Sequence, residues 1–252
     1  MTGLSRFSAA ASRLTGAGLE ALFPADCLLC VRPLPWRQRG GVCLPCWDRV
    51  LWTPGVRFGH GKLCALMWAA DYDGPIRRLI HQLKFHGLDY LGRPLGEELA
   101  RRLGPLLGVG LIARPDAVVP VPLHWWRRAR RGFNQAALLA AAFAHPLGLP
   151  LLPTALTRRG GGGRQLGSSQ RERHQALGDR FRGRSKPRRH GRVVPLAGRT
   201  ILLLDDVVTT GATLEACAAA LRAAGSGPVI GCAVARTPMR RSSDALRPAI
   251  RR

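Results

Sequence analysis

Two adjacent carboxylates, directly before a turn rich in hydroxyl groups and glycine, are the clearest chemical feature of the chain. They lie in ILLLDDVVTTGAT, residues 201–213. The four apolar residues that open this segment indicate a short buried parallel strand. Asp205 and Asp206 are therefore expected at its carboxyl end, where open α/β sheets bind ligands. Because ionised carboxylates only accept hydrogen bonds, the pair suits a ligand with neighbouring hydroxyl groups, such as a sugar.

The turn that follows the acidic pair predicts an anion site. Its residues are Thr209, Thr210, Gly211, Ala212 and Thr213, and a helix begins within them. Hydroxyl groups and backbone N–H groups at a helix start, reinforced by the helix dipole, suit a phosphate. The acidic pair and the turn together predict a phosphorylated sugar as the ligand. The GxxxxGK[ST] motif of P-loop nucleoside triphosphatases does not occur in the chain.

A second candidate phosphate site is the basic stretch LHWWRRARRGFNQ, residues 123–135. It follows the predicted strand DAVVPV and precedes a predicted helix over residues 133–144. Guanidinium groups bind phosphate oxygens in bidentate pairs, which makes these arginines candidate ligands. The candidates are Arg127, Arg128 and Arg131. The alternative is an ordinary basic loop whose two tryptophans pack in a seam between domains.

Four cysteines near the amino terminus have the spacing of a metal site. Cys27, Cys30, Cys43 and Cys46 form two C-x2-C pairs separated by twelve residues. Two such pairs can bring four thiolates into a tetrahedral Zn²⁺ site. The alternatives are a rubredoxin-type iron site, simple packing, or disulfides, which fit poorly with a chain that shows no secretory signal. The other three cysteines are expected to be buried among apolar residues: Cys64, Cys217 and Cys232.

In their order along the chain, these motifs resemble the ComF-type proteins, which carry a type I phosphoribosyltransferase-like domain. The similar segments are the cysteine pairs, YDGPIRRLIHQLKF, VVPVPL, RRARRGFNQ, RQLGSSQRERHQ and DDVVTTGAT. The resemblance implies that Asp205 and Asp206 hold the ribose hydroxyls of phosphoribosyl pyrophosphate and that the 209–213 turn holds its 5′-phosphate. It also implies Mg²⁺ at the pyrophosphate, with the arginine stretch as the pyrophosphate loop. Finally, it implies a role in DNA uptake or utilisation during competence, with DNA-uptake proteins as partners.

The net charge of the chain is +24, and the stretch from residue 158 to 199 is especially basic. That stretch has twelve arginines and one lysine against Glu172 and Asp179, a local net charge of +11. It predicts a mobile cationic loop that contacts a pyrophosphate or a nucleic-acid backbone. Within it, Arg164 and Gln165 are candidates to close over a substrate and exclude water. Since 36 of the 39 basic residues are arginine, a GC-biased genome is an alternative source of the charge.

The elements that must position these groups follow from apolar periodicity. It predicts helices within residues 71–87, 88–107 and 212–225 and strands within residues 69–74, 116–121 and 201–204. With the resemblance, this order gives an α/β fold, a type I phosphoribosyltransferase-like doubly wound parallel sheet with a small zinc-ribbon module. The expected parts are an N-terminal helix at 1–22, a zinc-ribbon-like module at 23–60, a phosphoribosyltransferase-like domain at 65–238 and a basic, disordered tail at 239–252. No apolar stretch reaches the roughly 18 residues of a membrane span, so a cytoplasmic protein without membrane insertion is expected.

Two functions fit these features. The first is a phosphoribosyltransferase that binds phosphoribosyl pyrophosphate, or a related sugar phosphate, with Mg²⁺. The second is a non-catalytic protein that binds single-stranded DNA and keeps the sugar-phosphate pocket as a binding or regulatory site. The sequence identifies no pocket for an acceptor base, so it predicts binding of the sugar phosphate rather than a particular transfer reaction.

Overall fold

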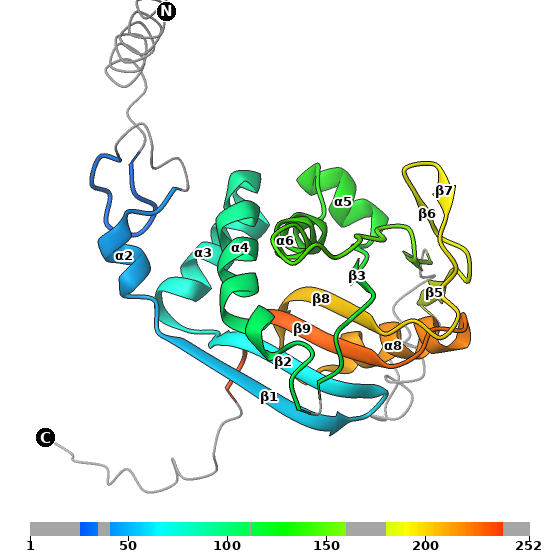
Figure 1. The fold of residues 1–252 in the computed structure, drawn as a ribbon. Coiled ribbons are helices and arrows are strands. Elements are labelled where there is room, and N and C mark those ends of the chain that lie inside the picture. The colour runs from blue at the N-terminus through cyan, green and yellow to red at the C-terminus, as the bar shows by residue number, and fades with distance from the viewer. Residues whose placement is uncertain (1–25, 35–40, 111, 160–179, 239–252) are drawn as a thin grey trace, which may run out of the picture.

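A five-stranded sheet with helices on both faces forms the body of the chain (Figure 1). The computed structural model describes residues 26–34, 41–110, 112–159 and 180–238. The strand order is β1-β2-β9-β8-β3; the last four of these are parallel, and β1 is antiparallel to β2. The strands are β1 (Trp52–His60), β2 (Leu63–Asp71), β3 (Ala117–Pro120), β8 (Ile201–Val208) and β9 (Val229–Arg236).

Helices cover both faces because strand side chains alternate between two separate apolar cores. Along β8, Leu202 and Leu204 belong to the first core, whereas Ile201 and Leu203 belong to the second. The first core is completed by α3 (Gly74–Phe85), α4 (Gly92–Leu103) and α6 (Gln135–Ala144), and the second by α8 (Ala212–Ala223). Short 3-10 turns, Asp89–Leu91 and Gly104–Leu106, flank α4. This arrangement confirms the predicted doubly wound α/β fold and adds an antiparallel edge strand.

The amphipathic helices follow the predicted periodicity. The buried residues of α3 are Ile76, Leu79, Ile80 and Leu83, which share one helix face. The positions of α8 predicted to be apolar, from Leu214 to Leu221, are likewise buried. Beyond the end of α8, Gly225 has a φ of +95°, a left-handed conformation that favours glycine and stops a helix.

Three segments differ from the expectation. β8 does not end at Leu204, because its parallel pairing with β9 continues as far as Val208. The basic stretch expected as a loop forms the helix α5 (Trp125–Arg131), which ends at Gly132 with a φ of +79°. The described end of the cationic segment forms strands rather than a mobile loop. In that part β4 (Leu156–Arg158) pairs with β5 (Phe181–Gly183), and β6 (Arg188–Arg189) pairs with β7 (Arg192–Val193).

The cysteine pairs and the short helix α2 (Leu44–Asp48) lie on the side of the molecule away from α5 (Figure 1). Cys27 and Cys46 are buried in the first apolar core. Residues 52–60, which were expected to end the zinc-ribbon-like module, form β1 of the main sheet. Cys217 and Cys232 are buried as expected, but Cys64 is exposed because it lies at the start of β2, beside the hairpin turn.

Several expectations fall on residues outside the described ranges: the N-terminal helix at 1–22, Arg164, Gln165 and the tail at 239–252. Within the part of the chain that the structure describes, no helix has the length and apolar character needed to span a bilayer.

Candidate functional site

The two aspartates of β8 point to opposite faces of the sheet, because successive strand side chains alternate. Asp206 lies on the side of α3, where its Oδ1 is 2.7 Å from Nζ of Lys84. Both side chains are largely withdrawn from water, with 5% of Asp206 and 19% of Lys84 exposed. The other carboxylate oxygen, Oδ2, is buried and has no hydrogen-bond partner among the described residues. Because a buried acceptor without a partner is unfavourable, this atom is poised to accept a hydrogen bond from a ligand.

Asp205 is half-buried, and its Oδ1 accepts a hydrogen bond from the backbone N–H of Asp206 at 2.8 Å. Burial, together with the neighbouring Asp206 carboxylate, raises the pKa of Asp205 to about 7. A ligand that donates hydrogen bonds to Asp205 favours its ionised form. Binding of such a ligand below neutral pH is therefore expected to release a proton.

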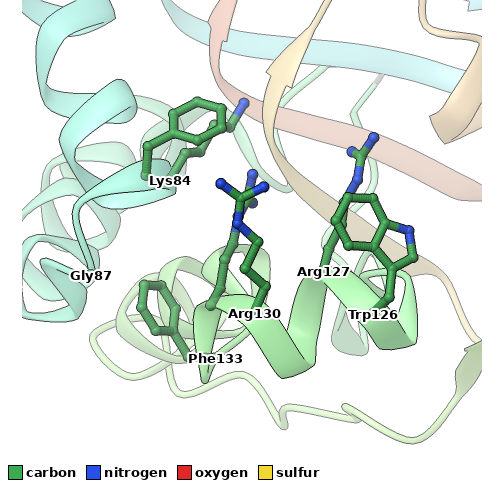
Figure 2. A pocket seen from close by; sticks show the side chains of 8 residues that line it. Lys84, Gly87, Trp126, Arg127, Arg130 and Phe133 are labelled. Atoms are coloured by element: carbon green, nitrogen blue, oxygen red, sulfur yellow. The ribbon is translucent and has the colours of Figure 1, made fainter.

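A pocket of about 280 Å³ opens between the end of α3 and the helix α5 (Figure 2). It is lined by Lys84, Phe85, Gly87, Trp126, Arg127, Arg130, Arg131 and Phe133. Arg131 stacks over the ring of Phe85, with its guanidinium carbon 5.1 Å from the ring centre. Because the lining contains four cations and no acid, the pocket suits a ligand with several phosphate charges.

The structure separates the predicted arginines into two groups. Arg127 and Arg131 line the pocket together with Arg130, whereas Arg128 does not. Arg130 and Arg131 follow Arg127 by three and four positions, and residues at these spacings share one face of a helix. Arg128 follows Arg127 by one position, so its side chain is turned away from that face. Trp125 is 68% exposed and Trp126 is 45% exposed, and neither packs against an apolar core, so the alternative of tryptophans packed in a seam between domains does not hold for the described residues.

The predicted anion turn lies at the start of α8 and is held from the side by His60. Gly211 precedes the helix with a φ of +84°, and Thr209 and Thr210 are exposed. At the tip of the β1–β2 hairpin, Nε2 of His60 lies 3.1 Å from the Thr210 carbonyl and 3.1 Å from Oε1 of Glu215. Since the first N–H groups of a helix lack partners within it, the turn can receive an anion.

The four cysteines form a cluster that fits a tetrahedral metal. Their Sγ atoms all lie within 4.8 Å of one another, and those of Cys30 and Cys43 are 3.7 Å apart. Zinc–sulfur bonds of about 2.3 Å place the sulfurs of a tetrahedral centre about 3.8 Å apart. Burial opposes ionisation of Cys27, but hydrogen bonds from the backbone of Cys43 and Cys30 lower its pKa to about 6. Burial and the neighbouring thiols raise the pKa of Cys46 to about 12, so four thiolates require a bound cation at neutral pH.

Sequence reasoning missed two residues of the site, Lys84 and His60. Lys84 did carry a signal, because it is one of only three lysines in a chain with 36 arginines. A compact ammonium group is not interchangeable with a guanidinium beside a buried carboxylate. His60 gave no such signal, since its partners, the Thr210 carbonyl and Glu215 of α8, lie 150 or more residues further along the chain.

Comparison with known proteins found four similarities. Residues 76–248 match the phosphoribosyl transferase domain family. The DNA utilization protein YhgH of Salmonella typhi is 32% identical over 232 residues, which cover 85% of this chain and 98% of the relative. Competence protein F of Haemophilus influenzae is 30% identical over 193 residues, which cover 75% of each chain. The glutamine phosphoribosylpyrophosphate amidotransferase structure from B. subtilis is 21% identical with a TM-score of 0.36; the match covers 56% of this chain and 25% of that one.

Proposed function

The chain belongs to the ComF group of the phosphoribosyl transferase domain family, and on this premise we propose that it binds phosphoribosyl pyrophosphate with Mg²⁺. The observation that carries the proposal is the buried Lys84–Asp206 pair beside a pocket lined by three arginines. Acceptors for sugar hydroxyls thus adjoin donors for phosphates. The names of the relatives support a role in DNA utilisation or competence, which we propose for this chain in the cytoplasm.

Each part of the site holds one part of the proposed ligand. The ribose lies beyond the end of β3, whose pairing with β8 stops at Leu204, so it reaches carboxylates on both faces of β8. There Asp205 and Oδ2 of Asp206 accept hydrogen bonds from its hydroxyls. The 209–213 turn receives the 5′-phosphate at the start of α8. The pyrophosphate occupies the pocket, where Arg127 and Arg131 donate to its oxygens together with Arg130.

The same groups favour departure of the pyrophosphate. As it leaves, positive charge develops on the ribose, and the fixed carboxylates of β8 stabilise that charge. The arginines of α5 stabilise the negative charge of the leaving group. Asp205 and Asp206 would be the carboxylates available to Mg²⁺ bound with the ligand, and the ion would offset part of the pyrophosphate charge. Oδ2 of Asp206, a buried acceptor that lacks a partner in the described chain, is the kind of oxygen ligand that fits this ion.

Titration calorimetry with phosphoribosyl pyrophosphate and Mg²⁺ tests the proposal. Arg131→Gln should weaken binding about tenfold or more, because a charge-assisted contact in the pocket is lost. Arg128→Gln is the matched control, since it removes the same charge from the same helix outside the pocket. Absence of heat at millimolar ligand, or equal weakening by both variants, would contradict the assignment. Release of pyrophosphate against a panel of bases then separates transfer from binding alone.

For the cysteine cluster we propose a structural Zn²⁺ site. Four thiol ligands fill a tetrahedral coordination sphere and leave no open position for a substrate. Metal analysis of the purified protein should therefore give about one zinc per chain. Stoichiometric iron, with the visible absorption of an iron–thiolate centre, would overturn this choice of metal.

A second function, single-stranded DNA binding, is favoured by the surface of α5. Trp125 and Trp126 are exposed there, and the guanidinium of Arg127 lies 5.6 Å from the ring of Trp126. Exposed aromatic rings beside arginines bind single strands by stacking and by charge. Trp125→Ala, outside the pocket lining, should weaken oligonucleotide binding, whereas the double variant Asp205→Asn/Asp206→Asn should abolish only sugar-phosphate binding. If the double variant loses both activities, separate sites are excluded.

A further inference from the structure

The helix α5 borders both the pocket beside α3 and the open surface of the molecule (Figure 2). Arg127, Arg130 and Arg131 line the pocket, which we call the α5 pocket. Trp126 forms part of the pocket wall as well, yet 45% of its surface stays exposed. Trp125, which precedes it, is 68% exposed and lies outside the pocket lining. The outer surface of α5 and the α5 pocket are therefore continuous through Trp126.

Aromatic rings extend along this continuous surface. Besides Trp126, the α5 pocket is lined by Phe85 and Phe133, and Phe85 is 60% exposed. The guanidinium carbon of Arg131 lies over the Phe85 ring, 5.1 Å from its centre, and that of Arg127 lies over the neighbouring tryptophan, 5.6 Å from the ring centre. A pyrophosphate makes no use of aromatic rings, whereas the bases of a single strand stack on them. The α5 pocket therefore fits two kinds of ligand, phosphates alone and phosphates joined to bases.

The arginines of α5 are available to a bound anion. None of the ion pairs among the described residues includes one of them. The fourth cation of the α5 pocket, Lys84, already pairs with Asp206. Arg130 follows Arg127 by three positions, so the helix offers both guanidinium groups to the same ligand. A phosphate that enters the α5 pocket thus meets the same donors whether it belongs to a pyrophosphate or to DNA.

We propose that single-stranded DNA and phosphoribosyl pyrophosphate exclude each other at α5, so that binding of the sugar phosphate releases the DNA. Both ligands depend on the arginines of α5, and one set of guanidinium groups cannot pair fully with two anions. The volume of the α5 pocket, about 280 Å³, is at the lower end for a site that holds one small molecule. A bound pyrophosphate therefore leaves no room for a DNA phosphate, and its charge repels the strand. The exclusion rests on both proposed functions, but not on any transfer reaction.

The two ligands share α5 and differ elsewhere. The sugar phosphate extends from the α5 pocket to the acidic pair of β8 and the 209–213 turn, whereas the strand extends outward over Trp125. Each ligand thus has contacts that the other lacks, and these contacts can be changed one at a time. Because coupling between two binding events is reciprocal, DNA must weaken binding of the sugar phosphate by the same factor.

A competition titration tests the proposal. Fluorescence anisotropy follows a labelled oligothymidylate of about 16 nucleotides, the upper size of a common single-strand site. Phosphoribosyl pyrophosphate with Mg²⁺, at about ten times the dissociation constant found by calorimetry, should raise the dissociation constant of the oligonucleotide about elevenfold. NaCl at the same ionic strength is the reference, because screening alone weakens DNA binding. A shift no larger than this reference, or one that levels off as the sugar phosphate still increases, would show that both ligands bind together and would overturn the proposal.

Two variants separate shared contacts from a general effect of charge. For competing ligands, the concentration of sugar phosphate that doubles the dissociation constant of the oligonucleotide equals its own dissociation constant. This concentration should rise about tenfold in Arg131→Gln and stay unchanged in Arg128→Gln, the matched variant outside the pocket lining. Equal concentrations in the two variants would contradict a shared pocket. Thermal unfolding checks that Arg131→Gln is folded; if it is not, Arg130→Gln, at an exposed position of the pocket lining, carries the same expectation.

Failure of the exclusion and failure of the proposed function give different results. If calorimetry detects no binding of phosphoribosyl pyrophosphate, the proposed function has failed, and inorganic pyrophosphate with Mg²⁺ becomes the competitor. Displacement of the oligonucleotide by pyrophosphate would then support the shared α5 pocket, and lack of displacement would overturn it. If the sugar phosphate binds but the oligonucleotide does not, the proposed function stands and the exclusion is overturned.

Discussion

Replacing Lys84 with methionine tests whether the acidic pair of β8 depends on a buried cation. Methionine keeps the apolar stem of the lysine and removes its ammonium group. At the Nζ–Oδ1 distance of 2.7 Å, the attraction to Asp206 is about 6 kcal/mol for an effective dielectric constant of about 20. Desolvation of both groups offsets much of this attraction, and removing one partner of a buried pair costs about 3–5 kcal/mol.

We expect Lys84→Met to lower the free energy of unfolding at pH 8 by about 3 kcal/mol, near the lower end of that range, because the lysine keeps 19% of its side chain exposed. For a chain of this size, the melting temperature should fall by roughly 6–12 °C. The loss should be smaller at pH 5.5. Asp205, with a pKa of about 7, is protonated there and no longer repels Asp206.

Urea unfolding followed by tryptophan fluorescence at both pH values measures this effect. The double variant Lys84→Met/Asp206→Asn is the matched control, because it leaves no charge at either position. It should be more stable than Lys84→Met alone, since an unpaired buried carboxylate destabilises the folded state more than two neutral side chains do. If Lys84→Met unfolds within about 0.5 kcal/mol of the wild type at pH 8, the change behaves like an ordinary surface substitution. The reasoning from a buried ion pair would then be refuted.

Three further predictions concern the rest of the site. The pKa of Asp205 in the folded chain, about 7, lies above its ordinary value of 3.8, so the stability from its protonated form is complete below pH 3.8 and lost as pH rises through 7. Asp205→Asn should therefore gain melting temperature relative to the wild type between pH 5 and pH 8, and an equal difference at both pH values would contradict this. Removal of the metal by a chelator, or Cys43→Ser, should lower the melting temperature, because the cysteine cluster then loses the metal ion that holds it together. An unchanged melting curve for the metal-free protein would exclude a structural role of the metal. His60→Ala should weaken binding of phosphoribosyl pyrophosphate about fivefold, because it releases the Thr210 carbonyl. His145→Ala, at an exposed position after α6, should leave binding unchanged. Equal effects of the two variants would show that His60 does not position the turn.

The sequence predicted α3 and α8 well, because their signals are local. A buried helix face repeats every three to four residues, so Ile76, Leu79 and Leu83 reveal it without knowledge of the rest of the fold. The cysteine pairs are a local signal as well. Each C-x2-C turn places two thiols side by side, and the structure needs only to bring the two turns together.

Two elements had no local signal. None of the residues of α5 is buried, so this helix carries no apolar stripe by which periodicity could find it. β1, with the sequence WTPGVRFGH, has no alternation of apolar and polar residues that would predict a strand. It is an edge strand that is held in place by its hydrogen bonds to β2. The sequence of β1 alone does not show that it has this partner.

The sequence by itself determined which chemical groups the chain contains: a pair of carboxylates before an anion turn, a row of arginines and four spaced thiols. Only the tertiary structure decided which of these groups meet. Because strand side chains alternate and helices cover both faces of the sheet, the adjacent Asp205 and Asp206 have different neighbours. Asp206 pairs with Lys84 of α3, whereas Asp205 accepts the backbone N–H of Asp206 and has Arg158 of β4 among the charges that act on it. Neither Lys84 nor Arg158 is close to the aspartates in the chain, so only the folding of the whole sheet could bring them together.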